Sequence, residues 1–280
     1  MKRILSFAGT ALLAAAALVL GLLAMESRLV YFPIREHAAA PADYGLPSEE
    51  LRLEAEDGVR LHGWWIRGIG REEKDRLAVL FFHGNAGNIS HRLERSRLLA
   101  ERFGLDILLL DYRGYGLSEG RPSEAGLYRD ARAAYGEAVR RGFAPDQILL
   151  FGESLGCAVA VQLATEKPCA GLVLETPFLS VPALARKYYP IVPGFVIRTR
   201  FDNEKKIAGV TAPKLFIQAE NDEIVPGTHA RRLHELSPPP KELYRIPGAR
   251  HNDTYAVGGE EYLRTWERFL RSISTGDGDQ

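Results

Sequence analysis

Short runs of apolar residues recur along most of the chain, and the segments between them carry apolar residues at every third or fourth position. The apolar runs cover residues 77–83, 106–111, 147–151, 171–175 and 214–219. Uninterrupted runs of this length are typical of strands that are buried on both faces. The segments with helical spacing are 90–102, 124–141, 155–166 and 228–236. This alternation predicts an α/β fold with a mostly parallel central sheet and helices on both faces.

The two ends of this region carry patterns of their own. Residues 51–56 and 59–66 alternate around the pair Asp57-Gly58, which is a strong signal for a hairpin of antiparallel strands. A last strand at 241–246 precedes an amphipathic helix over 259–273. We therefore expect antiparallel strands at the N-terminal edge of the sheet and a covering helix at its C-terminal edge.

Nearly forty residues separate the strand that ends at Glu175 from the strand that starts at Lys214. This length exceeds an ordinary connection, and four prolines in its first half prevent a long helix. Residues 177–212 are therefore predicted to form a small lid. A loosely ordered excursion is the alternative, but five aromatic residues would give a lid groups to bury: Phe178, Tyr188, Tyr189, Phe195 and Phe201.

The first 33 residues differ from the rest of the chain. Residues 4–25 carry no charge and are mostly Ala and Leu. As a helix they would reach about 33 Å, which matches a hydrocarbon core of about 30 Å. We expect a single-pass membrane anchor over 1–33 and a catalytic domain over 34–280. A secretion signal removed by cleavage is the alternative, although Glu26 stands where cleavage needs a small residue.

Charge and composition exclude several classes of function. The 280 residues include 36 basic and 36 acidic ones, so no overall field attracts nucleic acid. Basic residues flank both ends of the predicted anchor, which gives only a mild preference for an extracytoplasmic domain.

The two cysteines, Cys157 and Cys169, lie at opposite ends of a predicted helix, too far apart for a disulfide. No spacing typical of a metal or cofactor site is present, so neither is expected.

The segment Gly152-Glu153-Ser154-Leu155-Gly156 lies between an apolar strand and a helix of small residues. A G-x-S-x-G pattern in this context is typical of a sharp turn that exposes a nucleophilic serine. A simple turn is the alternative. We predict that Ser154 is a nucleophile, which requires a base and an acid that orients the base.

The predicted base is His251, because it follows the last strand and a Pro-Gly turn. His234 lies inside a predicted helix and is less suited. The predicted acid is Asp222, a few residues beyond the strand that ends at Ala219. Glu175 ends the preceding strand and remains the rival acid.

An oxyanion requires backbone N–H donors, and two positions offer them. One is Leu155, directly after the nucleophile and at the start of a helix. The other is Asn85, in the glycine-rich loop after the strand that ends near Phe82. His83 is expected to hold this loop in place, and Cys157 to be a buried thiol. The glycine-rich residues 111–120 are expected to form packing and one wall of the site.

Seven segments together resemble the α/β-hydrolase superfamily, and more narrowly its serine aminopeptidase-like subgroup of small membrane-anchored hydrolases. They are, in order, RLVYFP, FHGNAGN, DYRGYGLSEG, GESLG, LETPF, NDEIVP and GARHND. The resemblance covers about residues 28–270, and it implies the same triad of Ser154, Asp222 and His251, with the oxyanion amides on Asn85 and Leu155. Some members of the subgroup remove long acyl chains from cysteines of membrane proteins.

These observations predict a serine hydrolase that cleaves carboxylic esters or thioesters through an acyl-enzyme, acting on small acyl esters or lipidated substrates near a membrane. An aminopeptidase is one alternative, and it would need an acidic residue such as Glu204 in the lid to bind the substrate's amino terminus. A non-catalytic membrane scaffold is the other. The sequence determines neither the natural substrate nor the oligomeric state.

Overall fold

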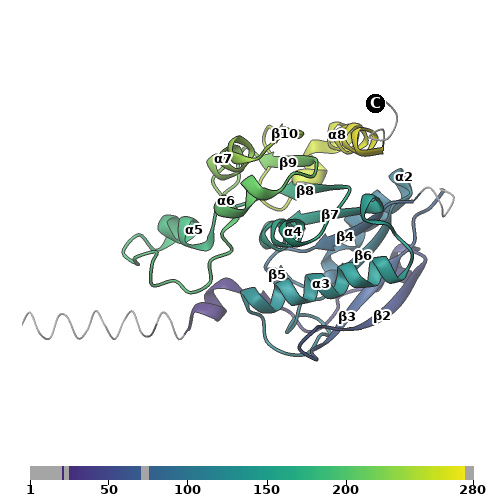
Figure 1. Ribbon diagram of the computed structural model, residues 1–280, viewed down its shortest axis with the longest axis horizontal. Coiled ribbons are helices and arrows are strands. Elements are labelled where there is room, and N and C mark those ends of the chain that lie inside the picture. The colour runs from purple at the N-terminus through teal and green to yellow at the C-terminus, as the bar shows by residue number, and fades with distance from the viewer. Residues whose placement is uncertain (1–20, 22–24, 71–75, 275–280) are drawn as a thin grey trace, which may run out of the picture.

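The computed structural model describes residue 21 and residues 25–70 and 76–274. Its centre is an eight-stranded sheet with the order β10-β9-β8-β7-β4-β6-β3-β2 (Figure 1). The strands are β2 (Ser48–Glu54), β3 (Arg60–Ile66), β4 (Ala78–Phe82), β6 (Asp106–Leu110), β7 (Ile148–Glu153), β8 (Gly171–Glu175), β9 (Lys214–Ala219) and β10 (Lys241–Ile246). Strands β2 and β3 pair antiparallel, β3 also runs antiparallel to β6, and the remaining pairs are parallel. The predicted fold class is confirmed.

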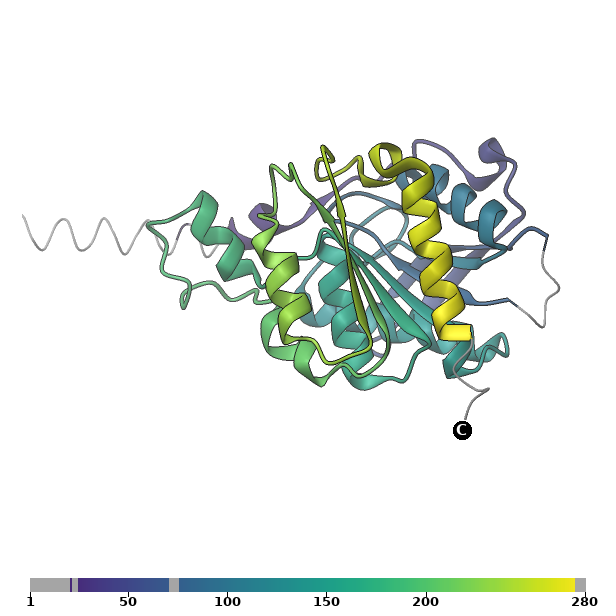
Figure 2. The same cartoon turned by 90° about the horizontal axis from the view of Figure 1, so that it is seen from above.

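Helices cover both faces of this sheet (Figures 1 and 2). One face is covered by α3 (Glu124–Arg140), α4 (Leu155–Glu166), α6 (Asn203–Lys206) and α7 (Thr228–Leu236). The other face is covered by α2 (Leu93–Phe103) and α8 (Thr254–Ser274). Helix α8 starts five residues before the predicted position, because a kink at Gly259, with a φ of 50°, interrupts the pattern on which the prediction rested.

The two helical layers explain why the strands are apolar at successive positions. In β4, Leu80 and Phe82 pack into the core beneath α3 and α4, whereas Val79 and Phe81 pack into the core beneath α2 and α8. Successive side chains of a strand point to opposite faces, so a strand between two layers needs apolar residues at every position. Burying each such side chain stabilises the fold by about 1.5–3 kcal/mol.

The lid, residues 177–212, contains the helix α5 (Val181–Tyr188) and, near its end, the short helix α6. The side chain of Ser180 accepts a hydrogen bond from the backbone N–H of Ala183 and so caps the start of this helix. Irregular chain follows α5, and after α6 a short 3₁₀ turn at Ile207–Gly209 leads back to the sheet. Of the aromatic residues expected to be buried, Phe178 and Phe201 are buried. That expectation is wrong for Tyr188, Tyr189 and Phe195, which are exposed: the two tyrosines stand at the end of α5, and the irregular chain after it carries Phe195 away from the core.

Short elements connect the N-terminal segment to the domain. Residues 25–30 are helical, and β1 (Phe32–Pro33) pairs in parallel with β5 (Ala86–Gly87). Further 3₁₀ turns lie at Pro41–Tyr44, Ile89–Arg92 and Pro145–Gln147. Within the described residues, none of the helices is both long enough and apolar enough to cross a bilayer. The predicted anchor over 4–25 lies almost wholly outside those residues.

Candidate active site

Ser154 stands at the turn between β7 and α4, in a backbone conformation that non-glycine residues rarely adopt. Its φ and ψ are 50° and −109°, which places this serine among the strained positions typical of functional sites. Glycine is needed on both sides. An added Cβ at Gly152 would lie 2.5 Å from the Cα of Cys157, and one at Gly156 would overlap the carbonyl oxygen of Phe82. The close approach of α4 to β4 and β7 thus fixes the turn that presents the Ser154 hydroxyl.

The structure brings together the three residues predicted to form a triad, although they come from three separate loops at the carboxyl ends of strands. The Nε2 atom of His251 lies 3.0 Å from the Oγ atom of Ser154. The Nδ1 atom of His251 lies 2.8 Å from the Oδ2 atom of Asp222. The side chains of His251 and Asp222 are 6% and 3% exposed. This is the arrangement in which an acid orients a base and the base contacts a nucleophile.

The loop around Asp222 holds its carboxylate in a single orientation. Its Oδ1 atom accepts hydrogen bonds from the backbone N–H groups of Ile224 and Val225, at 2.8 and 2.7 Å. The backbone N–H of His251 donates to the carboxylate of Glu223, at 3.3 Å. One oxygen of Asp222 therefore faces the loop, and the other faces the imidazole.

Glu175, the rival acid, is occupied elsewhere. Its carboxylate accepts hydrogen bonds from Arg95 at 2.7 Å, from the hydroxyl of Tyr262 at 2.8 Å, and from the hydroxyl of Thr254. Arg95 is itself buried and lies 3.5 Å from Glu153. Sequence reasoning missed Arg95, because an arginine in an amphipathic helix is expected to face solvent. This network ties the loop after His251 to the core of the sheet.

The two predicted oxyanion residues, Asn85 and Leu155, line the same cavity as Ser154. The side-chain amide of Asn85 donates to the carbonyl of Val30 at 3.1 Å. The backbone carbonyl of Asn85 accepts hydrogen bonds from the backbone N–H of Phe32 at 3.0 Å and from the hydroxyl of Tyr115 at 2.9 Å. The side chain and carbonyl of Asn85 are thus engaged with neighbouring segments, so any contribution to an oxyanion site is expected from its backbone N–H.

The glycine-rich residues 111–120 support the site from behind. The hydroxyl of Tyr112 donates to the carbonyl of His83 at 3.0 Å, and Tyr115 contacts Asn85 as described. The residues that line the cavity include none from this loop. The expectation that it forms a wall of the site is therefore wrong, because its tyrosines point at the backbone of the neighbouring loop.

Two buried groups close to the site are electrically neutral near pH 7. Burial lowers the pKa of His83 to about 4, and its Nδ1–H donates to the carbonyl of Gly84. Burial raises the pKa of Cys157 well above that of a free thiol, and its Sγ atom contacts the carbonyl oxygens of Gly152 and Glu175. Neither residue is poised for proton transfer or nucleophilic attack near pH 7.

An apolar cavity begins at Ser154 and extends beneath the lid. The space between its walls, together with the open solvent at its mouth, is about 1050 Å³. Apart from Glu26, its lining carries no charged side chain, and most of the residues are apolar or aromatic. They are Glu26, Leu29, Val30, Asn85, Ser154, Leu155, Phe178, Val181, Leu184, Ala185, Tyr188, Tyr189, Val192, Val196, Ile197 and Ile224. Such a cavity suits a hydrocarbon chain attached to a reacting carbonyl group.

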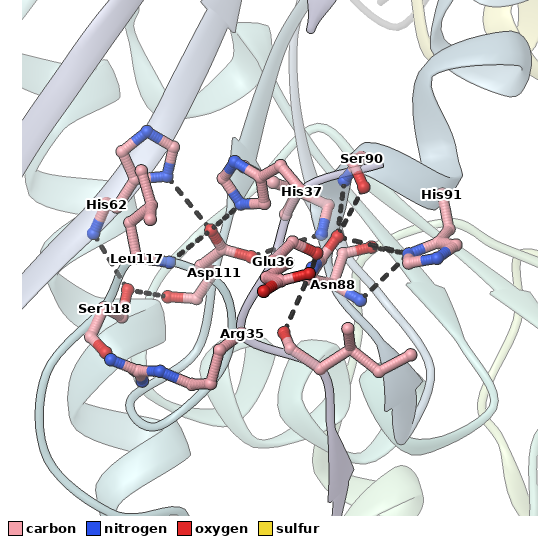
Figure 3. A network of polar contacts seen from close by, with 12 residues as sticks. Arg35, Glu36, His37, His62, Asn88, Ser90, His91, Asp111, Leu117 and Ser118 are labelled. Atoms are coloured by element: carbon pink, nitrogen blue, oxygen red, sulfur yellow. Dashed lines mark hydrogen bonds and ion pairs between the residues drawn. The ribbon is translucent and has the colours of Figure 1, made fainter. Parts of the chain in front are cut away.

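Within the described residues, three side chains could together ligate a metal ion: His37, His62 and Asp111. Figure 3 shows both imidazoles directed at the Asp111 carboxylate, at distances of 2.7 and 3.0 Å. The backbone N–H groups of Ile89 and Leu117 donate to the same carboxylate. Burial alone would raise the pKa of Asp111, but its hydrogen bonds to the two histidines hold that pKa well below its usual range. These are hydrogen-bond distances, so the cluster is explained as an attachment of the N-terminal segment to β3 and β6.

Comparisons with known proteins agree with this fold. Residues 78–212 match the family model described as the alpha/beta hydrolase fold. The chain is 38% identical over 260 residues to an uncharacterized protein of Mycobacterium tuberculosis, covering 92% of each chain. It is 34% identical over 278 residues to the alpha/beta hydrolase domain-containing protein WAV2 of Arabidopsis thaliana, covering 90% of each.

Among solved structures, the esterase Pf2001 of Pyrococcus furiosus is similar, with a TM-score of 0.70. The match covers 87% of this chain and 98% of that one, at 21% identity, which is a likeness of fold. The sheet order, the turn at Ser154 and the extended similarity to WAV2 lead to one conclusion. The chain belongs to the α/β-hydrolase family.

Proposed function

We propose that this hydrolase is a serine esterase or thioesterase that forms an acyl-enzyme on Ser154. The observation that carries the proposal is the continuous line of contacts from Ser154 through His251 to Asp222, at the mouth of an apolar cavity. The likeness of fold to a named esterase is consistent with it.

In the proposed reaction, His251 takes the proton of the Ser154 hydroxyl as the oxygen attacks the carbonyl carbon of the substrate. The negative charge that develops on the carbonyl oxygen is stabilised by the backbone N–H groups of Asn85 and Leu155. His251 then gives its proton to the departing alcohol or thiol. Water repeats the sequence on the acyl-enzyme and releases the carboxylic acid, while Asp222 keeps Nδ1 of the imidazole protonated throughout.

The apolar cavity supports an acyl chain as the recognised part of the substrate. Each CH₂ group moved from water into an apolar site is worth about 0.8 kcal/mol, which is roughly four-fold in kcat/KM at most. The specificity constant is therefore expected to rise with chain length until the cavity is filled. Residues 4–25 are proposed to anchor the protein in the cell membrane, with the catalytic domain on the extracytoplasmic side.

A peptidase is less well supported. Glu204, the acidic residue suggested for binding an amino terminus, lies 3.5 Å from Arg232 and does not line the cavity. Glu26 does line it, but its carboxylate accepts hydrogen bonds from the backbone N–H groups of Arg198 and Thr199. Glu204 is thus remote from the cavity, and the Glu26 carboxylate is already engaged with the backbone of the lid, which makes both poor candidates for binding a substrate ammonium group.

The test is labelling of the purified full-length chain with a fluorophosphonate probe, followed by hydrolysis of acyl esters from four to sixteen carbons. We expect labelling of the native chain, none of Ser154→Ala, and a rise in kcat/KM with chain length. Absence of labelling in the folded native chain would favour the non-catalytic scaffold. Preference for aminoacyl amides over acyl esters would favour the peptidase.

A further inference from the structure

Large apolar side chains stand exposed at the end of the molecule formed by the lid. Phe195 is 86% exposed and Ile191 is 80% exposed. Four more exposed apolar or aromatic residues complete what we call the lid-tip patch: Met25, Leu29, Tyr188 and Tyr189. Single exposed apolar residues are ordinary on a protein surface, but a group of this size marks an interaction site.

The patch is a joint surface of the lid and the N-terminal segment. The carboxylate of Glu26 accepts hydrogen bonds from the backbone N–H groups of Arg198 at 3.1 Å and Thr199 at 2.5 Å. Figures 1 and 2 both show the lid beside the helical residues 25–30, at one end of the molecule. The apolar lid therefore sits where the chain emerges from the uncharged run over 4–25.

The charges around the patch indicate what it contacts. Residues 177–201 include four basic residues and no acidic one, although basic and acidic residues are equal over the whole chain. Arg186, Lys187 and Arg198 are exposed in the lid, and Arg28 is exposed in the neighbouring helical turn. Apolar side chains surrounded by basic ones are typical of surfaces that lie in the headgroup region of a bilayer with anionic lipids.

We infer that the lid-tip patch docks on the lipid bilayer and that acyl chains pass from the bilayer directly into the cavity at Ser154. Leu29, Tyr188 and Tyr189 belong to the patch and also line the cavity, so one continuous apolar surface joins the two. A second copy of the chain would also cover apolar groups, but it would not match the basic residues around them. The inference rests on the proposed function, and it names the substrate class as esters or thioesters whose acyl chain already lies in the membrane.

The kinetic test uses the full-length chain in vesicles of phosphatidylcholine and phosphatidylglycerol. The variant Ile191→Ser with Phe195→Ser removes the two most exposed apolar groups, and neither residue lines the cavity. Because burial of such side chains is lost, hydrolysis of a bilayer-embedded long-chain ester is expected to fall roughly ten-fold or more. Hydrolysis of a water-soluble butyrate ester should not change. Val139→Ser is the matched control, since Val139 is 46% exposed on α3 and outside the patch.

A spectroscopic test locates the lid tip directly. In a Cys169→Ser background, Phe195→Cys is labelled with an environment-sensitive fluorophore, while Cys157 is fully buried. Brominated lipids should quench the label at Phe195→Cys and leave a label at Val139→Cys unaffected. An unquenched label whose emission depends on protein concentration would indicate contact with a second copy and overturn the inference.

The outcomes separate this inference from the proposed function. If the native chain fails to react with the fluorophosphonate probe, the proposed function fails, whatever the lid does. If it reacts, and the double variant hydrolyses the bilayer-embedded ester as fast as the native chain, the docking inference alone is wrong.

Discussion

Replacing Asp222 by Asn tests the assignment of the acid with almost no change in shape. The Oδ1 atom of Asp222 accepts from the backbone N–H groups of Ile224 and Val225. An asparagine must place its carbonyl oxygen there, because turning its NH₂ group toward two donors leaves both unsatisfied at about 1–3 kcal/mol each. The NH₂ group then faces Nδ1 of His251 and forces that nitrogen to act as an acceptor.

The consequence for catalysis follows from the tautomer. With Nδ1 as an acceptor, the neutral imidazole carries its proton on Nε2, the atom 3.0 Å from the Ser154 hydroxyl. It can no longer take the serine proton. The same change in a Ser-His-Asp triad lowers kcat about 10⁴-fold, which corresponds to about 5.5 kcal/mol in activation free energy.

The matched control is Glu175→Gln, which changes the rival acid in the same way. It removes the charge that faces buried Arg95, and breaking a buried ion pair costs about 3–5 kcal/mol. Arg95 keeps Glu153 at 3.5 Å, so we expect about 3 kcal/mol and a melting temperature lower by roughly 6–12 °C, with little loss of turnover. Butyrate ester hydrolysis and thermal melting are measured on both variants. The reasoning is refuted if Glu175→Gln abolishes turnover while Asp222→Asn retains it.

Three further predictions concern the turn, the buried histidine and the cavity. Gly156→Ala brings a Cβ into the carbonyl of Phe82, so folded yield and fluorophosphonate labelling should fall together. In the control Gly136→Ala, the added Cβ has no atom within 4 Å, and the change should stabilise α3 by about 0.5–1 kcal/mol in urea unfolding. Equal behaviour of the two variants would contradict the packing argument. Because His83 stays neutral in the folded chain down to about pH 4, an unfolded histidine with a pKa near 6.5 takes up its proton first. Stability from this residue is therefore complete above pH 6.5 and falls by about 3 kcal/mol toward pH 4. Because the pKa values of His229 and His234 are lowered too, urea unfolding should show a decline in both chains, larger by about 3 kcal/mol in the native chain than in His83→Asn. Ala185→Trp fills the cavity, so kcat/KM for a sixteen-carbon ester should drop at least about ten-fold while kcat/KM for a butyrate ester stays unchanged. Equal losses on both esters would argue against the acyl cavity.

Much of the fold could be predicted because the determining information is local. A strand between two helical layers must be apolar at every position, so its run of residues is visible in the sequence, as in β4 and β7. The turn at Ser154 could also be predicted from the sequence, because the close approach of α4 to β4 and β7 requires glycine at positions 152 and 156. The order of serine, acid and histidine then narrowed the candidates to a few strand ends.

The sequence favoured Asp222 over Glu175 but did not exclude Glu175, and the contacts that separate the two belong to the tertiary structure. Asp222 lies a few residues beyond a buried strand and Glu175 ends one, so local sequence gives only a preference between them. Contacts over long sequence separations distinguish them, because Arg95 engages Glu175 whereas the loop amides turn Asp222 toward His251. The exposure of Phe195 likewise could not be predicted from the sequence. Helix, strand and turn conformation follow largely from a residue's neighbours along the chain, whereas burial in an irregular segment and partners across the fold depend on how distant segments pack.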